Sequence, residues 1–211
     1  MPFYLQVNHN GHLTFETPWR RYIPLQFPMD QSRDIIAPYW TDLDNSRSGN
    51  IYYDQYTDGS ILQQVTQDIN SYFPEINFNA SWIFIATWHK VPYFSMPETQ
   101  STFQVVLASN GNYSFVLLNY GALAPRETSI EVRELQSLSN NTIFSKPLYT
   151  IGGTASSREL DGSSPRISLP QTFNYFGKSY SQIYVWSPSF LDFKPLFFLI
   201  VKTILKHSSK S

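Results

Sequence analysis

Apolar and polar residues alternate in short runs over the first 121 residues, and Asn-Gly and Asp-Gly pairs separate several of these runs. Such pairs tolerate the positive φ angles that tight hairpin turns demand. The first Asn-Gly pair predicts a hairpin that joins residues 4–7 to residues 12–15. A later pair predicts a second hairpin between residues 102–108 and residues 113–118.

Between the two hairpins, residues 82–88 are apolar on both alternating faces, which is typical of a central strand covered on either side. Residues 51–53 predict a further strand. Apolar residues at helical spacing before Pro74 predict one short helix over about residues 62–72. The pattern therefore predicts a mainly β fold: an antiparallel β-sandwich-like domain with one short helix.

The composition supports this fold class and excludes one kind of partner. Aromatic residues make up 17% of the chain, slightly more than the 15% that is charged, and they favour pleated, half-buried surfaces. A chain of 211 residues is long enough for one domain with a core of its own. The formal net charge is -1 without a stripe of Lys or Arg, so we expect no nucleic-acid partner.

Several chemistries have no residues to support them. The chain contains no cysteine, which excludes thiol catalysis, cysteine zinc sites and disulfides. It has no G-x-S-x-G, H-E-x-x-H, P-loop or dinucleotide motif, so we predict no catalytic residue and no enzyme. The first six residues lack the features of a signal peptide. The apolar run at residues 196–201 is far shorter than the roughly 20 residues of a membrane span.

Three stretches, in this order and spacing, resemble the nidogen-like (NIDO) domain family. They are IAPYWTDLD at residues 36–44 followed by GNIYY at 49–53, ATW at 86–88 with Val91, and TFQVVLA at 102–108. The resemblance implies a secreted protein or the ectodomain of a larger one. It also implies a part in extracellular matrix organisation or cell–matrix adhesion.

The resemblance also divides the chain. Residues 1–121 would form a NIDO-like domain without its opening strand. Residues 122–164 are rich in Ser, Thr, Gly and Pro and would form an irregular closing segment or linker. Residues 165–186 look like the beginning of a second copy, because Ile183 and Val185 echo the first strand of the chain. Residues 187–211 are an unassigned tail.

We therefore expect a non-catalytic module that contacts extracellular matrix or cell-surface proteins. Two alternatives stay open. A hydrolase that acts on glycans would need a cleft with two carboxyl groups roughly 5 to 10 Å apart. A structural repeat that associates with itself would use unpaired strand edges.

Asp42, Asp44 and Asn45 are the candidate metal ligands. They place oxygen atoms in a short loop before Gly49, which a hard cation such as calcium would accept. The loop lacks the closing Glu and the spacing of an EF-hand, and Asx side chains more often cap backbone amides. Capping is therefore the favoured interpretation, and we expect no other cofactor.

Three histidines are candidates for metal binding or catalysis. His9 and His12 flank the first hairpin turn without a third ligand, so we interpret them as residues on the hairpin surface. His89 follows the predicted central strand and is interpreted as a strand-end residue rather than a general base.

Asn79, Asn112 and Asn140 begin N-x-Ser/Thr triplets and are the predicted N-glycosylation sites. A group of aromatic residues has two interpretations, either a contact face or part of the sandwich core, and the core is favoured. The group comprises Trp19, Tyr22, Tyr39, Trp40, Tyr52 and Tyr53.

Overall fold

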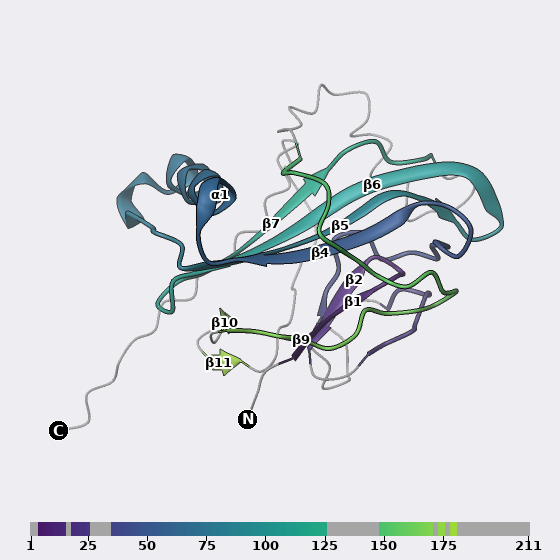
Figure 1. Ribbon diagram of the computed structural model, residues 1–211, viewed down its shortest axis with the longest axis horizontal. Coiled ribbons are helices and arrows are strands. Elements are labelled where there is room, and N and C mark those ends of the chain that lie inside the picture. Colours follow the sequence, from purple (N-terminus) through teal and green to yellow (C-terminus); the bar gives the residue numbers. More distant parts are fainter. Residues whose placement is uncertain are drawn as a thin grey trace.

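The computed structural model describes residues 4–15, 18–25, 35–125, 148–170, 173–175 and 178–180. In this part of the chain a small antiparallel sheet packs against one face of a larger antiparallel sheet, and one long helix crosses the larger sheet at one end (Figure 1). The prediction of a mainly β, sandwich-like domain with one helix is confirmed.

The small sheet has the strand order β3-β2-β1-β9. Its strands are β1 (Tyr4–Asn8), β2 (His12–Phe15), β3 (Ile35–Ile36) and β9 (Ile167–Ser168). β1 and β2 form the predicted hairpin, with Leu5 opposite Phe15. On the other side of β1, Leu5 lies opposite Ile167, so residues that are distant in sequence share one sheet.

The larger sheet has the order β7-β6-β5-β4-β8. Its strands are β4 (Asn50–Tyr56), β5 (Trp82–Tyr93), β6 (Met96–Ser109), β7 (Ser114–Tyr120) and β8 (Thr154–Ala155). β5 lies in the middle, and residues 82–88 are all buried, as the apolar run predicted. The second predicted hairpin is present as β6 and β7.

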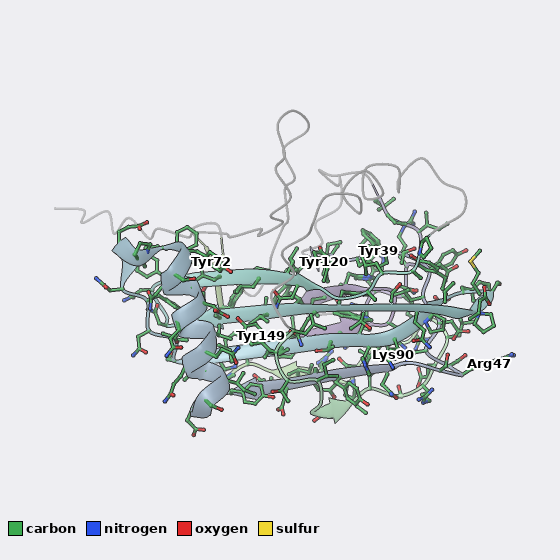
Figure 2. The ribbon with its side chains drawn as sticks, turned by 90° about the horizontal axis from the view of Figure 1, so that it is seen from above. Tyr39, Arg47, Tyr72, Lys90, Tyr120 and Tyr149 are labelled. Atoms are coloured by element: carbon green, nitrogen blue, oxygen red, sulfur yellow. The ribbon has the colours of Figure 1, made fainter. Side chains whose placement is uncertain are left out.

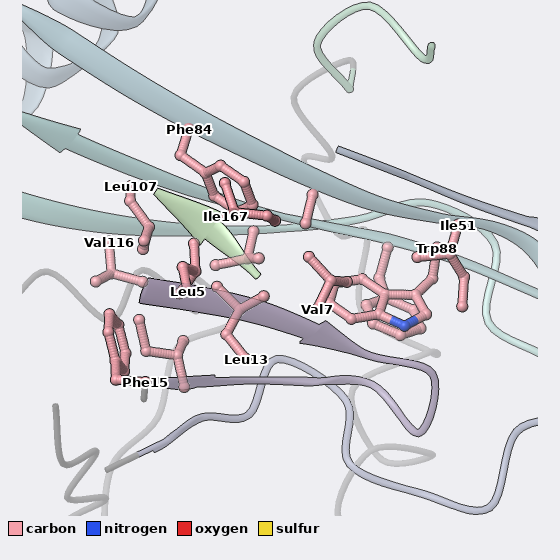
Figure 3. Close-up of a cluster of buried hydrophobic side chains, with 14 of the residues drawn as sticks. Leu5, Val7, Leu13, Phe15, Ile51, Phe84, Trp88, Leu107, Val116 and Ile167 are labelled. Atoms are coloured by element: carbon pink, nitrogen blue, oxygen red, sulfur yellow. The ribbon is translucent and has the colours of Figure 1, made fainter. Parts of the chain in front are cut away.

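The main core fills the space between the two sheets. Figure 3 shows Leu5 and Leu13 of the small sheet directed toward Phe84 and Trp88 of β5. The ring of Trp88 stacks on that of Phe103, with 4.8 Å between centroids and 13° between planes. All five side chains are fully buried, and removing one aromatic ring from such a core costs roughly 3 to 5 kcal/mol.

Helix α1 (Gly59–Tyr72) covers the other face of the larger sheet at one end (Figure 2). Val65 and Ile69, one turn apart, are buried in a second apolar cluster that also contains Ile83 and Val106 of the sheet. Phe73 ends the helix, and a 3₁₀ turn, η1 (Pro74–Ile76), follows because proline cannot continue an α-helix. The helix begins slightly earlier than the predicted residue 62. Among the described residues, no helix combines the length and apolar character of a membrane span.

Residues 148–168, here called the closing segment, run from the outer face of the larger sheet to the small sheet. Tyr149 lies on the outer face, where its backbone N–H and C=O both bond to the side-chain amide of Gln104, at 3.1 and 3.2 Å. Its hydroxyl donates to a carboxylate oxygen of Asp68 on α1 at 2.6 Å. β8 then pairs with the edge of β4, and β9 pairs with β1. The closing segment therefore connects both sheets and the helix.

These contacts bear on the predicted division of the chain. Part of the predicted closing segment or linker, residues 148–164, packs on both sheets, and β9 joins the small sheet. A hairpin of β10 (Phe173–Tyr175) and β11 (Lys178–Tyr180) follows. The ring of Phe173 packs against that of Trp82, with 6.2 Å between the ring centroids. Residues 181–211 lie outside the described residues, and the second copy stays a prediction.

Candidate functional site

Asn8, the last residue of β1, and the turn at residues 9–11 form a polar feature that makes many hydrogen bonds to other segments. We call these residues, Asn8, His9, Asn10 and Gly11, the polar turn; all four are buried. The prediction that His9 and His12 lie on the hairpin surface is therefore wrong. Two segments fold over this turn and exclude water from it: the loop after β3, and the closing segment.

His9 attaches the closing segment to the turn. Its Nε2 lies 2.9 Å from the Ser156 hydroxyl, and its Nδ1 lies 3.0 Å from the Glu159 carbonyl oxygen. Its backbone N–H donates to the carbonyl of Gly162 at 3.0 Å. A Cβ atom on Gly162 would lie 2.5 Å from Cε1 of the imidazole, so the ring packs directly on this glycine. Burial lowers the pKa of His9, and the hydrogen bond to Glu159 opposes that shift.

His12 is enclosed by two tryptophan rings. Its ring centroid lies 6.0 Å from that of Trp19 and 5.0 Å from that of Trp40, and its Nε2 is 3.1 Å from the Trp19 carbonyl oxygen. Burial lowers the pKa of His12 to about 4, so the ring is neutral at pH 7. No group of three or more His, Asp or Glu side chains in the described part of the chain is arranged to hold a metal ion.

The two asparagines of the polar turn hold the surrounding loops. The Asn8 side-chain oxygen accepts from the Trp19 backbone N–H at 3.0 Å, and that of Asn10 accepts from the Leu43 N–H at 2.9 Å. The Asn10 amide donates to the Asp161 carboxylate at 2.8 Å. Each side chain therefore joins the turn to a segment outside the hairpin.

Gly11 and Trp88 complete the junction. Gly11 has a φ of +80°, and a Cβ atom there would lie 1.9 Å from the Tyr39 carbonyl oxygen, so only glycine fits. The indole N–H of Trp88 donates to the backbone carbonyls of Asn8 and His9, each at 3.2 Å. The polar turn is thereby fixed to the central strand of the larger sheet.

The candidate calcium loop adopts an extended conformation, because Leu43 forms a bridge with Tyr93 of β5. Burial alternates along it: Asn45 is buried, whereas Asp42 and Asp44 are half-buried, so Asn45 faces away from the two carboxylates. The Asp44 carboxylate accepts from the backbone N–H of Ser46 at 2.8 Å, which is the capping contact that we favoured over a calcium ligand. A calcium site at Asp42, Asp44 and Asn45 stays a prediction.

Two of the three candidate glycosylation residues lie at the α1 end of the larger sheet. Asn79, just before β5, and Asn112, in the turn between β6 and β7, are both exposed. Their triplets meet at Ser109, whose carbonyl accepts from the Ser81 N–H at 2.9 Å and whose hydroxyl lies 3.3 Å from that of Ser114. Asn140 lies outside the described residues. Glycosylation at the three sites stays a prediction.

The aromatic group divides between the core and the surface. Tyr39 and Tyr53 pack against the main core, as predicted. Trp19 and Trp40 are half-buried around His12, Tyr52 is half-buried on β4, and Tyr22 is 42% exposed. The group does not form one continuous contact face.

His89 lies on β5 beyond the buried run and opposite Asn50, the first residue of β4. Because β5 continues to Tyr93, His89 lies within the strand, and its interpretation as a strand-end residue is wrong. Burial and the adjacent Lys90 both lower its pKa. The pairing of β5 with β6 shifts register between Trp88 and Val91, which is the position of a β-bulge.

An open hollow of about 540 Å³ lies beside the turn between β5 and β6. It is lined by Met96, Glu98, Thr99, Gln100, Leu123, Ala124 and Pro125. Glu98 is the one carboxylate among these described residues, whereas glycoside hydrolysis uses two. Met96 is an exposed apolar side chain of this lining, and Phe94, two residues earlier in the same turn, is exposed as well.

Sequence comparisons agree with this architecture. A family model described as the nidogen-like domain matches residues 3–167. Alpha-tectorin of Mus musculus is 41% identical over 117 residues, which cover 54% of this chain and 5% of that protein. Alpha-tectorin of Gallus gallus is 30% identical over 161 residues, 75% of this chain and 7% of that protein.

A second kind of relative is nidogen-1 of Mus musculus, 31% identical over 123 residues, 54% of this chain and 10% of that protein. The chain thus spans a tenth or less of the length of these three relatives. No solved structure matches the chain. The match of the family model runs from the residue before β1 to the first residue of β9, and so includes both sheets and the polar turn. The chain therefore belongs to the nidogen-like domain family.

Proposed function

We propose that this domain is a non-catalytic module of the extracellular matrix or of cell–matrix adhesion, and that it binds other matrix or cell-surface proteins. The family to which the chain belongs supports an extracellular setting, secreted or in the ectodomain of a larger protein. Its relatives include alpha-tectorin and nidogen-1, of which the chain spans only a small part. The domain would act as one module of a longer protein.

One observation carries the non-catalytic part of this proposal. The two buried histidines, His9 and His12, have ring nitrogens next to backbone carbonyls and a serine hydroxyl that hold loops in place. Neither histidine lines the hollow beside the β5–β6 turn, where Glu98 is the one titratable residue. The polar interior therefore supports a fixed scaffold better than a reaction site.

The turn between β5 and β6 is the surface that we propose for protein contacts. Phe94 is 46% exposed, and Met96, which lines the open hollow, is 38% exposed. Aromatic residues and Met are enriched in the centres of protein interfaces. This turn is held in place, because the Phe94 N–H donates to the Asp42 carbonyl and the Asp44 N–H donates to the Pro92 carbonyl, each at 3.0 Å.

A direct test is binding of the secreted full chain to cell-free extracellular matrix on a coated surface. We expect saturable binding that the double substitution F94S/M96S weakens at least fivefold. The matched control is I151S/L160S, which removes two apolar side chains of similar exposure, 38% and 49%, from the closing segment. The control should bind as the unmodified chain does.

Other results would contradict the proposal. Binding of the chain to matrix that is no stronger than its binding to albumin would argue against a protein contact at this turn. An equal loss of matrix binding in both double variants would argue against it as well. Release of reducing sugars from matrix glycans, abolished by Glu98→Gln, would favour the hydrolase. Concentration-dependent oligomers of the chain alone, measured by light scattering, would favour a self-associating repeat.

A further inference from the structure

The corner of the larger sheet at the β5 bulge gathers three cations from distant parts of the chain. Arg47 precedes β4, Lys90 lies in β5, and Arg158 belongs to the closing segment; all three are exposed. Arg158 donates to the Asn50 side-chain oxygen at 2.8 Å and to the Asn45 carbonyl at 3.5 Å. We call Arg47, Lys90 and Arg158 the cationic corner.

The backbone at this corner is built around Lys90. Its φ is +54°, a left-handed conformation that costs a residue with a side chain about 1 to 2 kcal/mol. The surrounding contacts hold it there: its N–H donates to the Thr102 hydroxyl at 3.0 Å. A Cβ atom on Gly49 would lie 2.6 Å from the Lys90 carbonyl oxygen, so glycine is needed for this approach. A bulge of this kind redirects a side chain that would otherwise follow the strand.

The cations of this corner are not neutralised. In the described part of the chain, no carboxylate pairs with Arg47, Lys90 or Arg158. The carboxylate of Asp44, which is near in sequence, accepts from the backbone N–H of Ser46 instead. Exposed permanent charges that no described carboxylate neutralises, carried by three separate segments, favour the approach of anions.

We propose that the cationic corner binds a sulfated polysaccharide. Figure 2 shows Lys90 and Arg47 on the part of the sheet away from α1, with Arg47 nearer the end of the molecule. Arg47 and Lys90 are thus spread along this part of the sheet, and Arg158 contacts Asn50 of β4, an arrangement that suits a polymer with repeated sulfates. Arg and Lys both donate to such oxyanions. Asn50 and His89, which lie beside them, are polar, so an apolar anchor for an acidic peptide is missing at these positions.

This inference goes beyond the protein contacts proposed above and depends on different residues. It also explains an asymmetry of the sheet. The predicted glycan acceptors Asn79 and Asn112 lie at the α1 end, whereas Asn50, His89 and the cationic corner lie at the opposite end of β4 and β5. Glycans at the α1 end would leave this corner accessible.

The test uses the full chain with heparin as the probe and measures affinity at several salt concentrations. We expect the double substitution R47Q/K90N to weaken heparin binding roughly tenfold. The slope of the logarithm of the affinity against the logarithm of the salt concentration should fall by the contribution of about two ionic contacts. Neither side chain has a hydrogen-bond partner among the described residues, and Asn tolerates the φ of position 90, so the variant should fold. The matched control is R20Q/R21Q, which also removes two exposed charges.

Unchanged heparin affinity in R47Q/K90N, or an equal loss in R20Q/R21Q, would overturn the assignment to this corner. Binding of desulfated heparin as tight as that of heparin would overturn the role of sulfate. Competition by poly-glutamate as effective as competition by heparin, at equal charge, would point to an acidic peptide and would also overturn the proposal. A variant that binds heparin weakly but still binds matrix proteins would support a site separate from the β5–β6 turn.

Discussion

Between the two sheets, the buried side chains are apolar and make contacts without direction, whereas the polar turn at residues 8–11 is held by hydrogen bonds to distant segments. In the first region a side chain such as Phe84 is stabilised by the area it removes from water. In the second, His9 and Asn10 need particular partner atoms, because a buried polar group without one costs about 1 to 3 kcal/mol.

The difference shows how this domain is closed. The apolar core brings the two sheets together, and the polar turn determines where the closing segment returns, through His9, Asn10 and the carbonyl of Gly162. A core of similar volume accepts other apolar side chains, but these polar contacts do not accept another residue type. Substitutions that affect one region and not the other test this distinction.

Trp88→Ala should have the largest effect, because this residue belongs to both regions. It loses the ring stacked on Phe103 and also the N–H that donates to the polar turn. We expect a loss of about 4 kcal/mol in the free energy of unfolding, measured by urea denaturation with circular dichroism. Trp88→Phe keeps an aromatic ring and loses the donor, so it should cost about 1 to 2 kcal/mol. A negligible loss in Trp88→Phe would show that the polar turn does not use this N–H.

Lowering the pH should act on the buried histidines, His9 of the polar turn and the adjacent His12, before it affects the apolar core. Burial lowers the pKa of His12 from 6.5 to about 4 in the folded state, so the unfolded chain binds the proton first. Stability is therefore complete above about pH 6.5 and falls by about 1.4 kcal/mol per pH unit toward pH 4. Burial lowers the pKa of His9 as well, which acts in the same direction.

Urea midpoints between about pH 7.5 and about pH 4.5 measure this effect. The His12→Gln variant should show a flatter dependence on pH than the unmodified chain, whatever its absolute stability. The same slope in both chains would contradict the burial of a neutral His12.

Gly11→Ala should cost roughly 2 kcal/mol or more, because it combines an unfavourable φ with a contact against the Tyr39 carbonyl. Gly111→Ala is the matched control. Gly111 has a similar φ of +87°, but a Cβ atom there would have nothing within 4 Å, so only the conformational cost of about 1 kcal/mol remains. Thermal unfolding compares the two, and equal shifts would contradict the close packing of the polar turn.

Local patterns in the sequence were sufficient for the elements that depend on neighbouring residues. The β1–β2 hairpin, the buried run of β5 and the apolar face of α1 follow from alternation, turn residues and helical spacing. The Asp44 contact with Ser46 also follows from the ordinary behaviour of Asx residues.

The polar turn was not predictable in the same way. Nothing near His9 or His12 in the sequence indicates burial, because the atoms that cover His9 come from Ser156 and Glu159, far along the chain. The cationic corner has the same origin, since Arg158 reaches β4 only after the closing segment has crossed the sheet edge. The two histidines and two asparagines within residues 8–12 are the one local sign that such a junction was possible.

Asn79→Gln and Asn112→Gln should have the smallest effect on stability. Both residues are exposed, so we expect changes within about 0.5 kcal/mol in the unglycosylated chain. When the chain is secreted from animal cells, each substitution should lower its mass by that of one N-glycan, as measured by intact mass spectrometry. An unchanged mass would contradict the predicted glycosylation at that residue.

Hydrogen–deuterium exchange of the full chain tests most directly whether the polar turn joins the closing segment to the sheets. The N–H of His9 donates to Gly162, that of Ser164 to Val7 and that of Ser156 to Ile51. We predict that these amides exchange as slowly as those of β5, within roughly tenfold, because all open in the same cooperative unit. Exchange of the Ser156 and Ser164 amides several hundred times faster than β5 would show that the closing segment opens by itself, and would contradict this account.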